Sequence, residues 1–385
     1  MKKQIIILLL FSIHASAQNK GSNPQFPKVK LTFPCTQEYI NNYKGKWLIP
    51  GIDPKTFGID EYHKQVLTRL NRIQGLVSET YPQPMGSDAF WSGGTRKLTF
   101  GDEVEYALSS DDEWKPKTLK TNPVDGFVYS LNLFAWDCNG TNEIMNGFPF
   151  SSGADLLIRS NDLEILNDYL EGNEWRIDGR PIKKKLYTIG KWKGYDLMAS
   201  AGNMSPDDDA TSHYILICRD GMLPIIPVTR KQYLERSLIY IKRTYDEMIN
   251  RIVKSNEEIP AQLRAPKEEI DRLIDYDEKT KSEALRKFQA ELEKTTRDGL
   301  LDAPAVIRVD PLFTVEGPIF LPEKDGGCLL ATENPNYWRK DLPKYVPQFF
   351  TVELSWRNNL GWSKDFKNII EEKFPLEQMK AMIDK

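Results

Sequence analysis

The segment from residue 229 to residue 300 constrains the fold most, because it reads as two consecutive long helices. Along the first helix the apolar residues recur at steps of three and four: Leu234, Leu238, Ile241, Tyr245, Met248 and Ile252. A loop containing Pro260 and Pro266 follows, and then a second, highly charged helix from about Lys267 to Asp298. We therefore predict an antiparallel helical hairpin, with one half on a sheet and its distal half in solvent.

Sequence patterns typical of β-strands lie on both sides of this hairpin. Before it come "GFVYSLNLFAW", "KLYTIGKWKGYDLMAS" and "HYILICRDGMLPIIPV", and the Asp220-Gly221 pair in the last of these predicts a hairpin turn. After it, "PQFFTVELSW" alternates apolar and polar residues, which is typical of a strand with one solvated face. Sequential hairpins favour an α+β fold with a mainly antiparallel sheet and a C-terminal β segment that returns to it.

The N-terminus predicts export. "MKKQIIILLLFSIHASAQ" has two lysines, a short apolar run from Ile5, and a small-x-small ending at Ala15-Ser16-Ala17, which together indicate a signal peptide cleaved before Gln18. The apolar run is too short for a membrane span, and no later segment is long and apolar enough. We therefore divide the chain into a signal peptide (1–17), an α+β domain (18–228), the helical hairpin (229–300) and a C-terminal β/α segment (301–385) that completes the main domain.

Four cysteines accompany the predicted export to an oxidising compartment: Cys35, Cys138, Cys218 and Cys328. Their wide spacing excludes a compact zinc cluster or a C-x-x-C redox pair. One or two disulfides are expected, with three possible pairings if all four cysteines are bridged. Cys218 ends the apolar run "YILIC", so a buried free thiol is the alternative for that residue.

Charge and motif content narrow the classes of function. Without residues 1–17 the chain has 50 basic and 55 acidic residues, and this near balance argues against binding to nucleic acid or to an anionic membrane. H-E-x-x-H, G-x-S-x-G, Walker-type and G-x-G-x-x-G motifs are absent from the sequence. A histidine-dependent catalytic site would have to use His63 or His213, and no cofactor or resident metal is expected.

A carboxylate pair of the glycoside-hydrolase type stays open as an alternative, because sequence spacing does not reveal such a pair. Tryptophans can stack on sugars, and we expect Trp91 and Trp338 to be the exposed ones. Trp47, Trp136 and Trp356 lie among apolar residues and are expected in the core.

The junction "PVTRKQ" is the candidate anion-binding site. Thr229, Arg230 and Lys231 open the first long helix, where unpaired N–H groups favour phosphate, sulfate or carboxylate. The competing interpretation is structural: Thr229 and Gln232 form a capping box, and Lys231 pairs with Glu235. Without a glycine that lets a ligand approach the backbone, the sequence favours the structural interpretation. Arg230 is the residue that decides between them.

Several blocks resemble exported bacterial proteins of the Gram-negative envelope whose activity is uncharacterised: "KGKWLIPG", "YPQPMGSDAFW", "IIPVTRKQYLE" and "ENPNYWRKDLPKYVPQFFTVELSW". The resemblance implies a periplasmic or extracellular setting and carries over no catalytic residue. We expect a non-enzymatic interaction protein whose hairpin or sheet face contacts a protein partner. The alternatives are a carbohydrate-active exported hydrolase and a structural module that forms a homodimer through the Leu234 to Ile252 seam.

Overall fold

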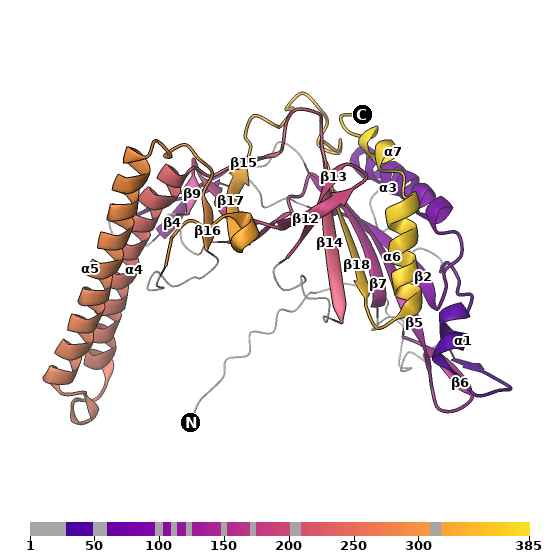
Figure 1. Cartoon of the computed structure of the whole chain (residues 1–385), viewed down its shortest axis with the longest axis horizontal. Coiled ribbons are helices and arrows are strands. Elements are labelled where there is room, and N and C mark those ends of the chain that lie inside the picture. The colour runs from indigo at the N-terminus through magenta and orange to yellow at the C-terminus, as the bar shows by residue number, and fades with distance from the viewer. Residues whose placement is uncertain are drawn as a thin grey trace.

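The computed structural model describes residues 28–48, 60–96, 103–108, 114–120, 125–147, 152–169, 175–200, 209–308 and 317–385. The expected signal peptide, residues 1–17, lies outside them. A nine-stranded sheet, a five-stranded sheet and a helical hairpin follow one another across the molecule (Figure 1).

The nine-stranded sheet is antiparallel at every pairing, which confirms the predicted α+β fold class. Its order is β1 (Lys28–Lys30), β6 (Glu143–Asn146), β5 (Gly126–Cys138), β7 (Ser152–Ser160), β18 (Phe350–Arg357), β14 (Ala210–Ile217), β13 (Tyr195–Ala199) and β12 (Tyr187–Trp192), and β2 (Ser87–Arg96) also pairs with β5. A Lys-Gly turn joins β12 to β13, and Lys193 and Gly194 adopt the positive φ angles that such turns need. The C-terminal strand β18 lies in the middle of the sheet.

One face of β18 is apolar as predicted, but the other is not solvated at its start. Val352 and Leu354 lie opposite Ile158 and Leu156 of β7, and all four are fully buried. On the opposite face Thr351 is also fully buried, and its hydroxyl donates to the carbonyl of Asp162 (2.6 Å). The alternating pattern therefore predicts the strand correctly. Its polar face is not fully solvated, because the second sheet of the molecule covers part of it.

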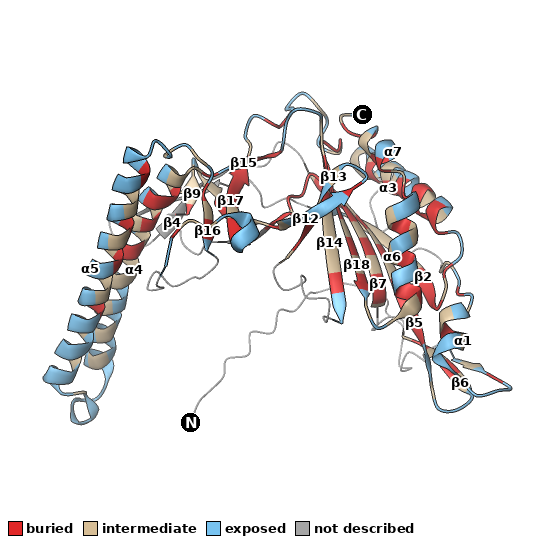
Figure 2. Ribbon diagram, in the orientation of Figure 1, coloured by how far each residue is buried: buried red, intermediate tan, exposed pale blue. Residues whose placement is uncertain are grey.

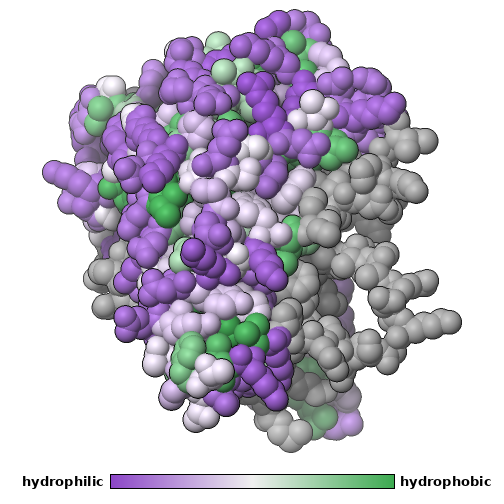
Figure 3. All heavy atoms as spheres, turned by 90° about the vertical axis from the view of Figure 1, so that its right-hand side faces the viewer, coloured by the Kyte–Doolittle hydropathy of each residue, from purple (hydrophilic) through white to green (hydrophobic). Residues whose placement is uncertain are grey.

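Helices cover one face of this sheet: α1 (Gln37–Asn42), α3 (Glu61–Thr80), α6 (Gly361–Lys373) and α7 (Leu376–Lys380). The apolar side of α3 faces the core, with Val66, Leu70 and Ile73 fully buried. Trp362 of α6 fits against the backbone of Gly153, where an added Cβ would lie 2.5 Å from the indole ring. The outer surface of this helical layer is mostly hydrophilic, with small scattered apolar patches (Figure 3).

The second sheet contains β15 (Ile225–Pro227), β17 (Gly327–Glu333), β11 (Lys183–Lys185) and β8 (Leu166–Tyr169), and β16 (Val306–Arg308) pairs with β17. The prediction of a β-hairpin at Asp220-Gly221 was wrong. The chain does turn there, with Gly221 at φ 75°, but β14 continues the first sheet whereas β15 pairs with β17 of the second. Long-range pairing with β17 therefore overrides the local hairpin signal.

Small elements complete the fold. Two short strand pairs are β3 (Glu103–Leu108) with β4 (Trp114–Lys120) and β9 (Arg176–Ile177) with β10 (Arg180–Pro181), and two 3-10 turns are η2 (Ala261–Leu263) and η3 (Glu323–Asp325). A small core that includes Leu186, Ile225 and Phe349 lies where the two sheets meet.

The helical hairpin consists of α4 (Arg230–Glu258) and α5 (Lys267–Arg297), joined through η2. Its base packs on the second sheet, where Leu234 and Ile241 of α4 and Phe288 of α5 are buried with Leu330 of β17. Beyond this base the hairpin projects away from both sheets, and its distal half is largely exposed (Figure 2). Among the described residues, no helix is long and apolar enough to cross a membrane.

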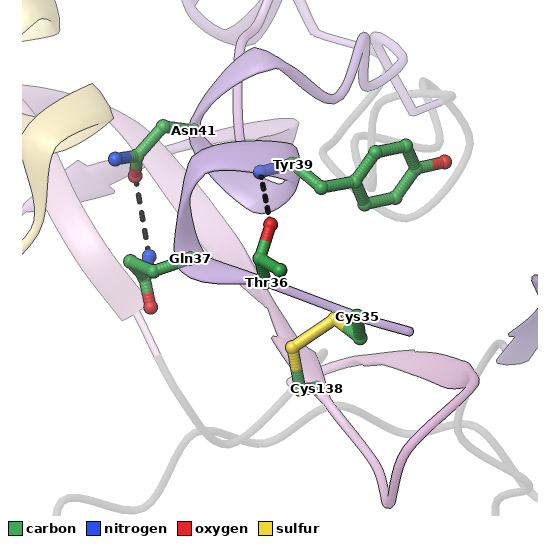
Figure 4. Close-up of a disulfide and its surroundings, with 6 residues drawn as sticks. All are labelled: Cys35, Thr36, Gln37, Tyr39, Asn41 and Cys138. Atoms are coloured by element: carbon green, nitrogen blue, oxygen red, sulfur yellow. Dashed lines mark hydrogen bonds between the residues drawn. A yellow bond between two sulfur atoms is a disulfide. The ribbon is translucent and has the colours of Figure 1, made fainter. Parts of the chain in front are cut away.

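One disulfide joins Cys35 to Cys138, with 5.7 Å between their Cα atoms (Figure 4). It ties the segment before α1 to the end of β5, next to the Thr36 hydroxyl that caps α1 by accepting from the Tyr39 N–H. Cys218 and Cys328 are free, so of the open pairings only this one forms. Burial raises the pKa of the Cys328 thiol to about 11, which keeps it protonated and unreactive at neutral pH.

Replacing both Cys35 and Cys138 by serine should lower the free energy of unfolding by roughly 3 to 5 kcal/mol, because the bridge closes a long loop in the unfolded chain. The sequence separation of the two cysteines is 103 residues. Urea denaturation of the oxidised protein and the variant measures the difference. Cys218→Ala is the control and should change stability by less than about 1 kcal/mol. Equal stability of the oxidised protein and the double variant would contradict the expectation.

Candidate functional site

The predicted anion-binding junction is built around a complete capping box. The Thr229 hydroxyl accepts from the Gln232 N–H (3.2 Å), and the Gln232 side chain accepts from the Thr229 N–H (2.9 Å). The next two N–H groups of the helix are also used, since Arg230 donates to the Ala303 carbonyl (2.9 Å) and Lys231 to the Leu301 carbonyl (3.0 Å). The backbone donors that would favour an anion at this helix start are therefore occupied by the chain itself.

The two cationic side chains of the junction do not converge. Arg230 stacks over the ring of Phe320 at 4.6 Å, and no carboxylate contacts it among the described residues. Its Nε is buried without a hydrogen-bond acceptor. Lys231 lies 4.0 Å from Glu235 on the exposed side of α4, as the sequence predicts. At this junction the group left to bind an anion is therefore the Arg230 guanidinium, which is stacked on an aromatic ring.

A second polar cluster lies on the sheet face opposite the helices. Arg159 of β7 pairs with Glu353 of β18 (2.7 Å), and the hydroxyl of Tyr214 on β14 donates to the same carboxylate (3.0 Å). Arg159 and Glu353 expose 13% and 14% of their side chains, so this ion pair is largely removed from water. We call Arg159, Tyr214 and Glu353, together with Asp155 of β7, the polar cluster.

Asp155 gives the polar cluster its second carboxylate. Asp155 lies opposite Ser355 of β18, and Glu353 is its diagonal neighbour on the same face of the sheet. Such diagonal neighbours lie roughly 7 to 8 Å apart. Burial raises the pKa of Asp155, and the nearby charge of Glu353 raises it further, while the hydrogen bond from Ser152 (2.6 Å) opposes the shift. The cluster thus holds one carboxylate fixed by an arginine and one whose pKa is raised above its ordinary value.

That arrangement meets part of what a carboxylate-pair hydrolase needs. A raised pKa suits a general acid, and a paired carboxylate suits a base or nucleophile. The expectation that Trp91 and Trp338 are exposed was wrong, however. Trp91 is buried and stacks on Tyr129 at 5.7 Å, and Trp338 is buried against Phe349 with its indole N–H donating to Glu333. Neither can serve as a sugar-stacking platform.

The two histidines contact carboxylates in the structure. His63 lies 2.7 Å from Asp60 at the start of α3, and His213 of β14 lies 3.5 Å from Glu371 of α6. Across the described part of the chain, no group of three or more His, Cys, Asp or Glu side chains is arranged to hold a metal ion.

The distal hairpin is the third candidate surface. Large exposed apolar side chains gather on α4, η2 and α5: Ile239, Met248, Val253, Ile259, Leu263, Leu273 and Tyr276. Leu263 at the tip is 71% exposed and Tyr276 is 68% exposed. We call Leu263, Leu273 and Tyr276 the tip surface. Apolar groups kept in water at the end of a projection favour contact with another molecule.

The polar cluster was missed because its signal is not local. In "SGADLLIRS", Asp155 and Arg159 flank three apolar residues, and this local pattern can be read from the sequence. Its partner Glu353 lies 194 positions after Arg159, and only the pairing of β7 with β18 brings them together.

Comparison with protein-family models, with curated proteins and with solved structures finds no match to this chain.

Asp155→Asn should become increasingly stabilising, relative to the native protein, as pH rises from about 4 to 7. The pKa of Asp155 is raised in the folded state, whereas an unfolded aspartate titrates near about 3.9. The stability that the protonated native Asp155 contributes is therefore complete at low pH and is lost as pH rises through the folded pKa. Urea denaturation across this pH range measures it, and replacement of the exposed Asp196 of β13 by asparagine is the control. A pH-independent difference would contradict the expectation.

Proposed function

We propose that this protein is an exported, non-enzymatic binding protein that contacts a protein partner through the distal half of its helical hairpin. The observation that carries the proposal is the tip surface, where Leu263, Leu273 and Tyr276 stay exposed. The apolar side chains at the hairpin base are, by contrast, buried. Burying such side chains against a partner would contribute about 25 cal/mol for each Å² of apolar surface. The predicted signal peptide and the resemblance to envelope proteins support the exported setting.

The shape of the hairpin supports the same role. Its base is held by the buried aromatic residues Trp175, Tyr233 and Phe288, with Trp175 and Tyr233 stacked at 5.6 Å. The distal half has few buried side chains, and Asp277 is the one nearest the tip on α5. A rigid base that carries an exposed end places the tip surface beyond both sheets, where a large partner can reach it (Figure 2).

Replacing Leu263, Leu273 and Tyr276 by serine should abolish recovery of the partner from envelope fractions by the purified, tagged protein. The three side chains are exposed, so the variant should keep its far-ultraviolet circular dichroism and its thermal unfolding within about 0.5 kcal/mol per site. Partner recovery is measured by mass spectrometry of eluted proteins.

A control variant replaces Ile189, Met222 and Leu223 by serine. These three are also exposed apolar residues, and they lie outside the hairpin. The control should recover the same partners as the native protein. If native protein, tip variant and control all recover identical proteins, or none, the proposed function is wrong.

The polar cluster supports a second candidate function, hydrolysis of a glycoside by Asp155 and Glu353. The favouring observation is the raised pKa of Asp155 beside the Glu353 carboxylate, which pairs with Arg159. The expected outcome is release of nitrophenol from one or more members of a p-nitrophenyl glycoside panel, lowered at least about 100-fold in Asp155→Asn. Ser212→Ala is the control. Absence of turnover by the native protein on the whole panel rejects this candidate.

A further inference from the structure

A second stripe runs along α4 beside the Leu234 to Ile252 seam. Its members are spaced by three, four, three and four positions: Ile239, Lys242, Asp246, Ile249 and Val253. This spacing is the heptad pattern of a helix that packs lengthwise against another helix. We call these five residues the α4 stripe.

The chain leaves Ile239, Lys242 and Val253 of the α4 stripe exposed, whereas Ile249 is half-buried and Asp246 contacts Lys281 of α5. Leu234 and Ile241, which belong to the seam that the sequence suggested for a dimer, are fully buried at the hairpin base. The α4 stripe lies roughly 100° around the helix from that seam. Accordingly, Ile239 is 53% exposed and Val253 is 37% exposed. The basal part of the seam is therefore used within the chain, whereas much of the stripe is accessible to another molecule.

We propose that the α4 stripe binds the α4 stripe of a second copy of this chain, with the two helices antiparallel. This inference rests on the proposed role of the hairpin as a binding element, and it adds an identified partner on a surface distinct from the tip surface. Antiparallel pairing about a two-fold axis makes each contact occur twice, as an isologous interface requires.

Charge complementarity selects this partner and this orientation. When Ile239 is placed opposite Ile249 of the partner subunit, the same register puts Lys242 opposite Asp246 of the partner subunit. Lys242 is exposed and has no ion-pair partner among the described residues. Asp246 accepts from Lys281 of its own chain at 2.5 Å, yet 44% of its side chain stays exposed. Two ion pairs would thus be flanked by two pairs of isoleucines.

The charge of the whole hairpin favours the same orientation. Its distal part, residues 246–276, has eight acidic and five basic residues. The proximal parts, residues 230–245 and 277–297, together have eleven basic and six acidic residues. An antiparallel pair places the acidic end of one hairpin beside the basic base of the other, whereas a parallel pair places like charges together. The pattern therefore complements a second copy of itself.

Sedimentation velocity of residues 18–385 tests the association. The native chain should form a concentration-dependent dimer, and a variant with Ile239→Glu and Ile249→Glu should be monomeric at the same concentrations. Lys242→Glu should weaken the dimer at least about tenfold in Kd, and the loss should be smaller at high salt. Because the substituted side chains are exposed or half-buried on one helix, circular dichroism should be unchanged. The Leu263→Glu control should still dimerise.

Cysteine cross-linking tests the register, in a chain whose free Cys218 and Cys328 are replaced by alanine. Mixing an Ile239→Cys chain with an Ile249→Cys chain should give a disulfide-linked dimer, whereas either chain alone should stay monomeric on a non-reducing gel. A native chain that is monomeric at all concentrations, or cross-linking of Ile239→Cys with itself, overturns the inference. The partner-recovery experiment on the tip surface is unaffected by either result, so failure here is distinguishable from failure of the proposed function.

Discussion

The pairing of β18 with β7 on one side and β14 on the other is the interaction on which the rest of the structure depends. Phe350 lies opposite Ser160 and Ile217, so a strand near the end of the chain is inserted between two strands that precede it by more than a hundred residues. Without β18, β14 to β12 would be separated from the rest of the sheet. β18 therefore joins the two parts of the sheet, and the segments between β14 and β18 lie outside it.

Those intervening segments form the hairpin and three strands of the second sheet, whose other two strands, β8 and β11, come before β14. β15, β16 and β17 pair among themselves, and α4 and α5 leave from this sheet and return to it. Because the hairpin base has its own buried core around Trp175, Tyr233 and Phe288, its distal half needs no support from the main sheet. The fold thereby combines two surfaces of different chemistry. The polar cluster is built on rigid paired strands, and the α4 stripe and tip surface lie on a projecting element.

The sequence predicts elements whose determinants are local. The helix starting at Arg230 was located by Thr229 and Gln232, whose reciprocal hydrogen bonds are present. The Asp220-Gly221 hairpin failed because the partner of β15 is β17, about a hundred residues away.

Side-chain environments that depend on several segments were not predictable in the same way. Trp91 packs on Tyr129 of β5, and Trp338 packs on Phe349, which immediately precedes β18. Asp155 and Glu353 become neighbours only after β7 and β18 pair. The spacing of the α4 stripe is visible in the sequence. However, the sequence does not show which of two stripes on one helix packs inside the protein and which faces solvent. Burial decides that assignment.

The central claim is that the fold leaves the distal hairpin unpaired for use in binding. Hydrogen–deuterium exchange of residues 18–385 at low and high protein concentration tests it most directly. Peptides from the base, around Leu234 and Phe288, should exchange slowly at both concentrations. Peptides covering residues 246–276 should exchange faster in dilute protein, and those covering the α4 stripe should slow on concentration. Distal exchange as slow as that of the base in dilute protein, with no effect of concentration, would contradict the account.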